Sequence, residues 1–142
     1  MVAKNHYNKN KVILVPEEIL EISPFDYGNN DYEKSIIKDV VVNEVWSGFA
    51  EEIQEAITRI WIPTYTEMGF AGSSYAEVEG KAFPWFDSDE KRKRKHRGYA
   101  RWYWLSTPGT GSSSSAWYVL ADGTSNGNSV SYHYGVVPAL EI

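Results

Sequence analysis

Hydrophobic and polar positions follow two different periods in the two halves of the chain. Over residues 31–46, apolar side chains recur at helical spacing and charged side chains occupy the other positions. This pattern predicts an amphipathic helix. Its apolar face consists of Ile36, Ile37, Val40, Val41 and Val45. Ser47 and Gly48 then end the helix, and residues 51–57 predict a second, short helix.

Short apolar runs elsewhere predict strands. Residues 11–15 form such a run before Pro16, and residues 59–62 form another before Pro63. The C-terminal half predicts strands at 99–105, 116–121 and 130–136, a turn at Asp122-Gly123, and an edge strand or tail at 138–142. The order of elements therefore predicts an α+β fold, with short helices packed on a small, irregular, mainly antiparallel sheet with long loops.

Length and composition are those of one globular domain. The chain has 142 residues, of which 42% are hydrophobic and 23% are charged. We expect a flexible segment at residues 1–10, which are polar and rich in Asn and Lys, and a folded domain at residues 11–142. The sequence contains no cysteine, which excludes disulfides and thiolate chemistry. We find neither a signal peptide nor a membrane-spanning run, so the localisation stays open between a phage virion and the bacterial cytoplasm or surface.

Charge is unevenly distributed along the chain. The net charge is −5, yet residues 91–101 hold seven of the 14 Lys and Arg residues. Acidic residues precede this block at 87–90. A run of this kind, in an otherwise acidic chain, indicates a solvated face more than a nucleic-acid surface, which needs a broader basic area. We therefore expect no nucleic-acid partner and no membrane insertion.

No residue pattern indicates catalysis, a metal or a cofactor. The Gly-rich stretch 109–112 lacks the Lys of a phosphate-binding loop, and the three histidines lie in unrelated segments. Residues 122–128 contain one acidic residue, fewer than a calcium loop needs. The serines at 112–115 could form a triad with Asp122 and His133 only by chance, because no nucleophile elbow surrounds them.

Aromatic residues are unusually frequent in the C-terminal half. Eight of the 21 aromatic residues lie between residues 99 and 134. Strand alternation places Trp102 and Trp104 on one face of the sheet and Tyr103 on the other, so both faces are aromatic. Two interpretations remain open at this point. In the first, half of these side chains fill the core and the rest cover the sheet edge. In the second, the side chains that point outward form a recognition surface together with Ser, Asn and His.

Three C-terminal segments resemble a bacterial and phage family of unknown function. They are Trp-Tyr-Trp-Leu-Ser-Thr-Pro at 102–108, Ala-Trp-Tyr-Val leading to Asp-Gly at 116–123, and Gly-Val-Val-Pro-Ala-Leu at 135–140. The family signature runs Trp-Trp-Leu-Arg-Ser-Pro, Val before Asp-Gly, and Gly-Val-Arg-Pro-Ala-Leu. The resemblance extends over about residues 11–142. It implies the C-type-lectin-like fold of formylglycine-generating enzymes and of the variable proteins of diversity-generating retroelements.

The sequence departs from this family at several positions. Ser106 and Val137 stand where the family has arginines. The absence of cysteine means that formylglycine chemistry is not carried over, and the calcium motif of true C-type lectins is missing. We also find no strand before Val12, so we expect a fragment of a longer protein, or else a homo-oligomer or a partner chain that completes the sheet.

The resemblance implies a display scaffold, and it favours the recognition surface over the purely structural interpretation. We therefore expect a non-catalytic module of a phage or bacterial surface that binds a cell-surface glycan or protein. The alternative is a structural or assembly domain of a virion or tail, with no small-molecule ligand. The predicted ligand-binding residues are Arg101, Tyr103, Trp117, Tyr118, Asn126, Asn128, Tyr132 and His133.

Overall fold

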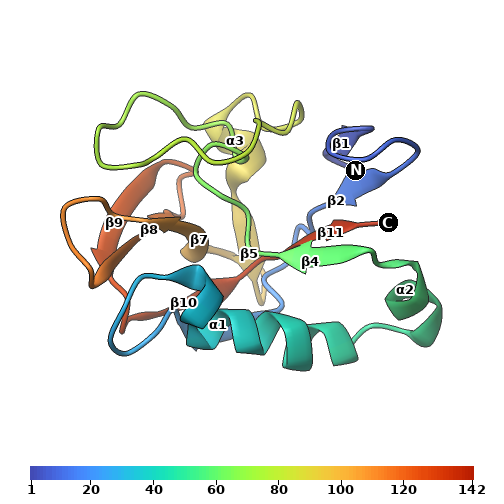
Figure 1. The fold of residues 1–142 in the computed structure, drawn as a ribbon, viewed down its shortest axis with the longest axis horizontal. Helices are drawn as coiled ribbons and strands as arrows, with labels where there is room; N and C mark the ends of the chain where they lie inside the picture. Colours follow the sequence, from blue (N-terminus) through green and yellow to red (C-terminus); the bar gives the residue numbers. More distant parts are fainter.

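Two small sheets and a separate hairpin form the framework of the computed structural model, which describes residues 1–142 (Figure 1). The first sheet is entirely antiparallel, in the order β1-β2-β11-β4. Its strands are β1 (Ala3–Lys4), β2 (Val12–Leu14), β11 (Ala139–Glu141) and β4 (Arg59–Trp61). The first and last strands of the chain therefore lie in the same sheet, and the two termini lie on the same side of the molecule (Figure 1).

The second sheet has five strands in the order β3-β10-β7-β8-β9. β10 and β7 pair in parallel, and the other pairs are antiparallel. The strands are β3 (Glu21–Pro24), β10 (His133–Val136), β7 (Tyr103–Pro108), β8 (Ser115–Val119) and β9 (Ser125–Ser129). A separate hairpin pairs β5 (Arg94–His96) with β6 (Tyr99–Arg101). The α+β class expected from the sequence is confirmed.

The helices are few and short. η1 (Tyr32–Lys34), α1 (Ile36–Asp39) and the wider-turned η2 (Val40–Val45) follow one another, and α1 and η2 form one continuous helix along the sheets (Figure 1). Ser35 caps α1 by accepting a hydrogen bond from the Lys38 amide, and the buried face is the one that the periodicity predicted. The others are α2 (Glu51–Ala56) and α3 (Asp89–Arg92). None of them is long and apolar enough to cross a membrane.

β7 is buried on both of its faces. Tyr103 and Leu105 belong to one apolar cluster, and Trp104 belongs to a second cluster on the opposite face. Polar atoms on these side chains find partners inside the protein: the Tyr103 hydroxyl donates to the Arg92 carbonyl (2.5 Å), and the Trp104 indole donates to the Ser23 carbonyl (3.1 Å). The central strand therefore connects two cores.

The N-terminal residues differ from the flexible segment that we expected at 1–10. β1 pairs with β2, with Ala3 opposite Ile13, and Val2 and Ala3 are buried. Asn5 and Asn10 adopt positive φ angles of 51° and 63° in the connecting turn. Asparagine tolerates this conformation better than most residues, so these polar residues form a turn where their composition suggested disorder. A strand therefore precedes Val12, where the sequence showed none.

Two further strand predictions need correction. The C-terminal strand, expected at an edge, lies in the interior of its sheet because β11 pairs with β2 on one side and β4 on the other. The run 99–105 is not one strand, because β6 ends at Arg101 and β7 begins at Tyr103. β6 belongs to the hairpin with β5, and β7 belongs to the five-stranded sheet. The first error concerns pairing between segments that are distant in the sequence, and the second concerns a local hairpin that ends the strand at Arg101.

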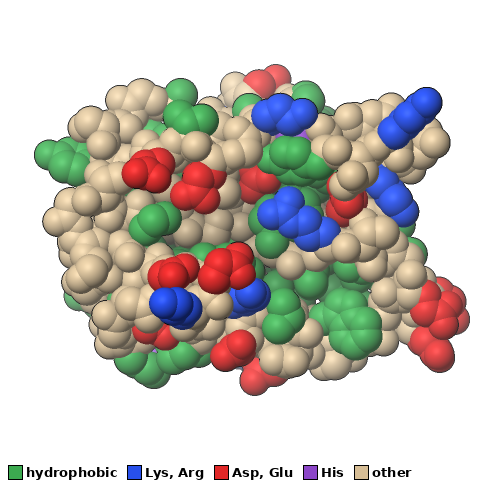
Figure 2. All heavy atoms as spheres, viewed as in Figure 1, with side chains coloured by type: hydrophobic (Ala, Val, Ile, Leu, Met, Phe, Trp, Pro, Cys, Tyr) green, Lys and Arg blue, Asp and Glu red, His purple; other side chains and the backbone are tan.

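The basic block at 91–101 is only partly solvated. Arg92 and Arg94 are buried, whereas the sequence pattern suggested a solvated face. The Arg92 guanidinium donates to the carbonyls of Met68, Gly69 and Phe86 and pairs with Asp89. Arginine can be buried when its donors are satisfied in this way. Over the face seen in Figure 2, acidic and basic side chains are interspersed.

The double burial of β7 predicts a large effect of Trp104→Ala. Removal of a fully buried indole and its hydrogen bond to Ser23 leaves a cavity, so the free energy of unfolding is expected to fall by about 3–5 kcal/mol. The measurement is urea unfolding followed by circular dichroism. Trp85→Ala, at a side chain that is 49% exposed, is the matched control and is expected to change stability by about 0.5 kcal/mol or less.

Buried tyrosines predict a loss of stability in alkali. Burial raises the pKa of Tyr32 to about 12, and burial with the hydrogen bond to Glu67 raises the pKa of Tyr7 to about 12. Burial also raises the pKa of Tyr103. These folded-state pKa values exceed the unfolded value of about 10, so the stabilisation is complete below pH of about 10 and is lost as pH rises further.

The measurement is the free energy of unfolding in urea between about pH 8 and pH 12. Tyr32→Phe removes one of the titrating groups, so its stability is expected to decline less steeply than that of the unaltered protein. Tyr27→Phe, at an exposed ring, is the control and is expected to leave the slope unchanged. Equal slopes for the protein and Tyr32→Phe would contradict the prediction.

Candidate functional site

Four aromatic side chains form a continuous surface at one end of the five-stranded sheet. We call Trp102, Tyr118, Tyr132 and Tyr134 the aromatic patch. Ring centroids of Trp102 lie 5.4 Å from those of both Tyr118 and Tyr134, and Tyr118 lies 4.8 Å from Tyr134. Tyr132 and Tyr134 are stacked at 5.9 Å with an interplanar angle of 3°.

Strand register explains why the patch exists. Because β10 and β7 are parallel with Gly135 beside Tyr103, Tyr134 lies beside Trp102 on the opposite face from these two residues. Trp104 and Tyr118 are cross-strand partners on the same face as the patch. This face is buried where Phe25 and Val41 pack against Trp104, and it becomes exposed at the patch. The exposed fraction is 41% for Trp102, 52% for Tyr132 and 4% for Tyr118.

The Tyr118 and Tyr134 hydroxyl groups stay protonated at neutral pH. Burial raises the pKa of Tyr118, although the nearby Asn128 amide lowers it. Burial, followed by the proximity of Tyr118, raises the pKa of Tyr134. Both phenols can therefore donate as well as accept hydrogen bonds beside an apolar ring surface.

Two asparagines line the outer edge of the patch on β9. The bonds from the Leu120 amide to the Thr124 carbonyl and from the Val130 amide to the Ser114 carbonyl fix the ladder, so that the amides of Gly127 and Ser129 point away from β8. Asn126 Oδ1 accepts from the Gly127 amide and Asn128 Oδ1 accepts from the Ser129 amide, each at 2.8 Å. The exposed edge of the sheet is thus partly satisfied by side chains.

The side-chain amide nitrogens of Asn126 and Asn128 take no part in these bonds to the strand edge. Asn128 Nδ2 donates to the Tyr134 hydroxyl at 3.2 Å, which joins the edge to the patch. Asn126 Nδ2 has no hydrogen-bond partner within the protein, and Asn126 is exposed. This amide is available to an external acceptor.

A cleft of about 410 Å³ adjoins the patch and shares Trp102 and Tyr134 with it. Arg101, His96 and His133 contribute the polar side chains, and the rest of the lining is mainly apolar. The His133 ring is held near Tyr27, with 3.4 Å between Nε2 and the Tyr27 hydroxyl. The full lining is Ile22, His96, Ala100, Arg101, Trp102, Ala121, His133, Tyr134 and Gly135.

Most of the sequence-predicted ligand residues lie near one another. Tyr118 and Tyr132 belong to the patch, Asn126 and Asn128 border it, and the cleft contains the other two polar residues of the prediction, Arg101 and His133. Tyr118 contributes only its edge, because it is almost fully buried. The structure therefore brings six of the eight predicted residues to one region.

Tyr103 requires correction, and Trp117 lies away from the other predicted residues. Tyr103 is fully buried in the core, because β7 is covered on both faces and alternation alone cannot show that. Trp117 lies on the opposite face of the sheet from Tyr118, where its ring packs 4.7 Å from Tyr65 and its indole donates to the Tyr75 carbonyl. Neither side chain can contribute to the patch.

Sequence reasoning missed two central residues of the site, Trp102 and Tyr134. The available signal was the grouping of Trp102 with Trp104 and of Tyr132 with Tyr134 by alternation. That signal identifies residues on a common face, but it does not show where a helix stops covering that face. The missing information was the tertiary packing of the helix on the sheet.

The structure gives no support to the other chemistries considered. No group of three or more His, Asp or Glu side chains is placed to hold a metal ion. Of the three residue types in the chance triad, His133 contacts Tyr27, Asp122 accepts from Thr124, and Ser112 bonds to Ser114. These side chains therefore do not form a hydrogen-bonded relay.

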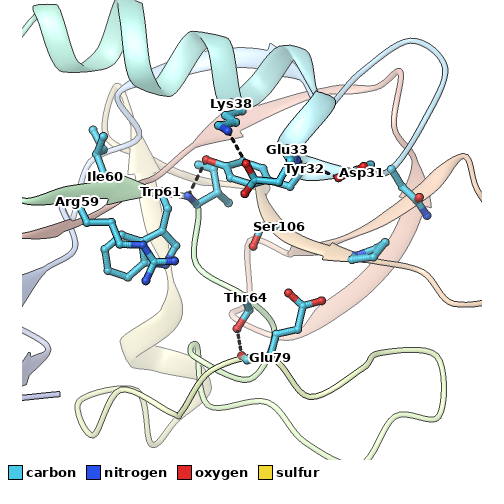
Figure 3. Close-up of a pocket in the computed structure, with 13 residues that line it drawn as sticks. Asp31, Tyr32, Glu33, Lys38, Arg59, Ile60, Trp61, Thr64, Glu79 and Ser106 are labelled. Atoms are coloured by element: carbon cyan, nitrogen blue, oxygen red, sulfur yellow. Dashed lines mark hydrogen bonds and ion pairs between the residues drawn. The ribbon is translucent and has the colours of Figure 1, made fainter. Parts of the chain in front are cut away.

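A second cavity, of about 430 Å³, lies between η1, β4 and the loop that follows β4 (Figure 3). We call it the polar cavity. Its side chains include charged residues of both signs, and Ser106, one of the two positions where the resembling family has arginine, lines it. The other such position, Val137, is fully buried in the core. The lining is Asn30, Asp31, Tyr32, Glu33, Lys38, Arg59, Ile60, Trp61, Ile62, Thr64, Glu79, Ser106 and Pro108.

Comparison with known proteins identifies a family and no characterised relative. No curated protein and no solved structure matches the chain. A family model described as a domain of unknown function, DUF6273, matches residues 58–142, which is more than half of the chain and includes all three C-terminal motifs. The matched region contains the aromatic patch and β4 of the polar cavity. The chain therefore belongs to the DUF6273 family of domains of unknown function.

Proposed function

We propose that this domain is a non-catalytic recognition module that binds a cell-surface glycan or protein through the aromatic patch. The principal support is the continuity of the four rings: Trp102 and Tyr132 are substantially exposed, and they pack on Tyr118 and Tyr134, which join them to the core. Exposed aromatic side chains held by a rigid sheet provide a large contact area at a low cost in conformational entropy.

The polar groups around the patch suit a hydroxyl-rich ligand. The free Asn126 amide donates, the phenol groups donate and accept, and Arg101 and His133 extend the polar lining into the cleft. A sugar ring offers apolar C–H faces for stacking and hydroxyl groups at its rim. This combination favours a glycan over a purely apolar ligand.

A C-type-lectin-like architecture and a place on a phage or bacterial surface are also part of this proposal. The three C-terminal motifs and the α+β arrangement with long loops support them. The second candidate is an assembly role, in which the patch is buried against another copy or another virion component. The exposed Trp102 and Tyr132 rings favour a contact of that kind as well.

Binding to a broad glycan array tests the proposal. We expect specific binding that survives a metal chelator, and we expect Trp102→Ala and Tyr132→Ala each to weaken it by about tenfold or more, because each removes a stacking surface. Trp85→Ala is the matched control, since it removes an exposed indole from another part of the molecule, and is expected to bind normally.

Melting temperatures of all variants are compared with those of the unaltered protein, so that a loss of binding is separated from a loss of folding. Binding that is unaffected by both patch variants would contradict the proposal. No glycan binding, together with a dimer in light scattering that Tyr132→Ala dissociates, would support the assembly role instead.

A further inference from the structure

The cleft beside the aromatic patch carries positive charge and contains no carboxylate. Its lining includes Arg101, His96 and His133 but no Asp or Glu, although the protein as a whole has a net charge of −5. At neutral pH the Arg101 guanidinium supplies a permanent positive charge, and the two imidazoles can donate or accept hydrogen bonds. A cleft lined by one sign of charge attracts ligands of the opposite sign.

The acidic residues that are nearest to the cleft in the sequence are bonded elsewhere. The Glu21 carboxylate accepts a hydrogen bond from the Ile22 amide at 3.1 Å. The Asp122 carboxylate accepts from both the amide and the hydroxyl of Thr124. Neither of them is within ion-pair distance of Arg101. No carboxylate of the protein therefore forms an ion pair with the charge of Arg101.

The hairpin of β5 and β6 places Arg101 at the wall of the cleft. Arg101 is the last residue of β6, and it is paired across the hairpin with Arg94. Its guanidinium lies 5.6 Å from the centroid of the Tyr99 ring, which is two residues earlier in the same strand. A cation at this distance from an aromatic ring is attracted to it, so this contact favours one orientation of a long side chain.

Trp102 connects the charged cleft to the aromatic patch. Its exposed indole lines the cleft together with Arg101, and it also packs 5.4 Å from Tyr118 within the patch. A guanidinium binds a planar carboxylate through two parallel N–H donors. A ligand that joins a stacking ring to a carboxylate can therefore contact the indole and the guanidinium at the same time.

We propose that the cleft binds an acidic sugar, with the carboxylate of the sugar at Arg101 and its ring against Trp102. This inference rests on the proposed function, because it names the class of glycan that the recognition module selects. His96 and His133 form hydrogen bonds with the sugar hydroxyls. The cleft volume of about 410 Å³ lies within the range of about 300–1,000 Å³ that small-ligand pockets occupy. A neutral sugar can still stack on the patch, but it gains nothing from Arg101.

Calorimetric titration with matched acidic and neutral glycans tests the inference. The probes are 3′-sialyllactose with its neutral counterpart lactose, and trigalacturonic acid with its methyl ester. We expect at least one acidic probe to bind with a dissociation constant of about 1 mM or tighter, and about tenfold more tightly than its neutral counterpart. This preference is expected to shrink as sodium chloride is raised from about 50 mM to about 500 mM, because salt screens an accessible ion pair.

Variants of Arg101 identify the group that selects the charge. Arg101→Gln is expected to weaken binding of the acidic probe by about tenfold or more and to remove its salt dependence, while binding of the neutral counterpart is unchanged. Arg101→Lys keeps the charge but loses the planar pair of donors, so we expect an intermediate affinity. Arg97→Gln is the matched control, since it removes an exposed guanidinium of the same hairpin outside the cleft, and is expected to bind normally.

Melting temperatures verify that the three variants are folded. Equal affinity for acidic and neutral probes, or an Arg101→Gln variant with unaltered affinity for the acidic probe, would overturn this inference and leave the proposed function intact. Loss of binding in Trp102→Ala together with normal binding in Arg101→Gln would do the same. If no glycan binds, acidic or neutral, on the array or in the calorimeter, this inference fails together with glycan recognition by the patch.

Discussion

The burial of β7 on both faces is the constraint on which the rest of the structure depends. A strand that is covered on one side only can leave alternate residues in water, but β7 must place every side chain from Tyr103 to Thr107 inside the protein. Tyr103 and Trp104, two large rings at adjacent positions, are directed into separate cores. Each core then requires its own cover, the α1–η2 helix on one side and the first sheet with the long loop at residues 63–88 on the other.

In that long loop, hydrogen bonds of a few polar side chains fix the path of the backbone in place of regular secondary structure. Residues 63–88 contain no helix or strand, yet their path is fixed. Glu67 accepts hydrogen bonds from Tyr7, Trp61 and the Thr64 amide, and Arg92 donates to the carbonyls of Met68, Gly69 and Phe86. Two buried charges with satisfied partners therefore organise a segment whose sequence has no periodic signal.

The sequence was sufficient where structure depends on local periodicity. A helix at 36–45 within the predicted span of 31–46, a short helix at 51–56 and the turn at Asp122-Gly123 follow from spacing and glycine chemistry, and they are present; Ser35, in an extended conformation, separates a short helical turn at 32–34 from the main helix. It was insufficient where distant segments decide the outcome. The interior place of β11 depends on strands more than 75 residues away, and the burial of Tyr103 depends on a cover that alternation does not reveal. The same reason explains why Trp102 was missed: its exposure depends on where the helix ends.

The exposed edge of β9 is protected from pairing with other strands by uncharged side chains rather than by charged ones. Many exposed strands are kept apart by lysines, whose repulsion weakens as salt screens it. Here the outward amides of Gly127 and Ser129 are occupied by uncharged carboxamides from Asn126 and Asn128. Carboxamides and backbone amides do not titrate, and neither carries a net charge. The strand is therefore shielded from other strands to the same degree at low salt concentration, at high salt concentration and at mildly acidic pH.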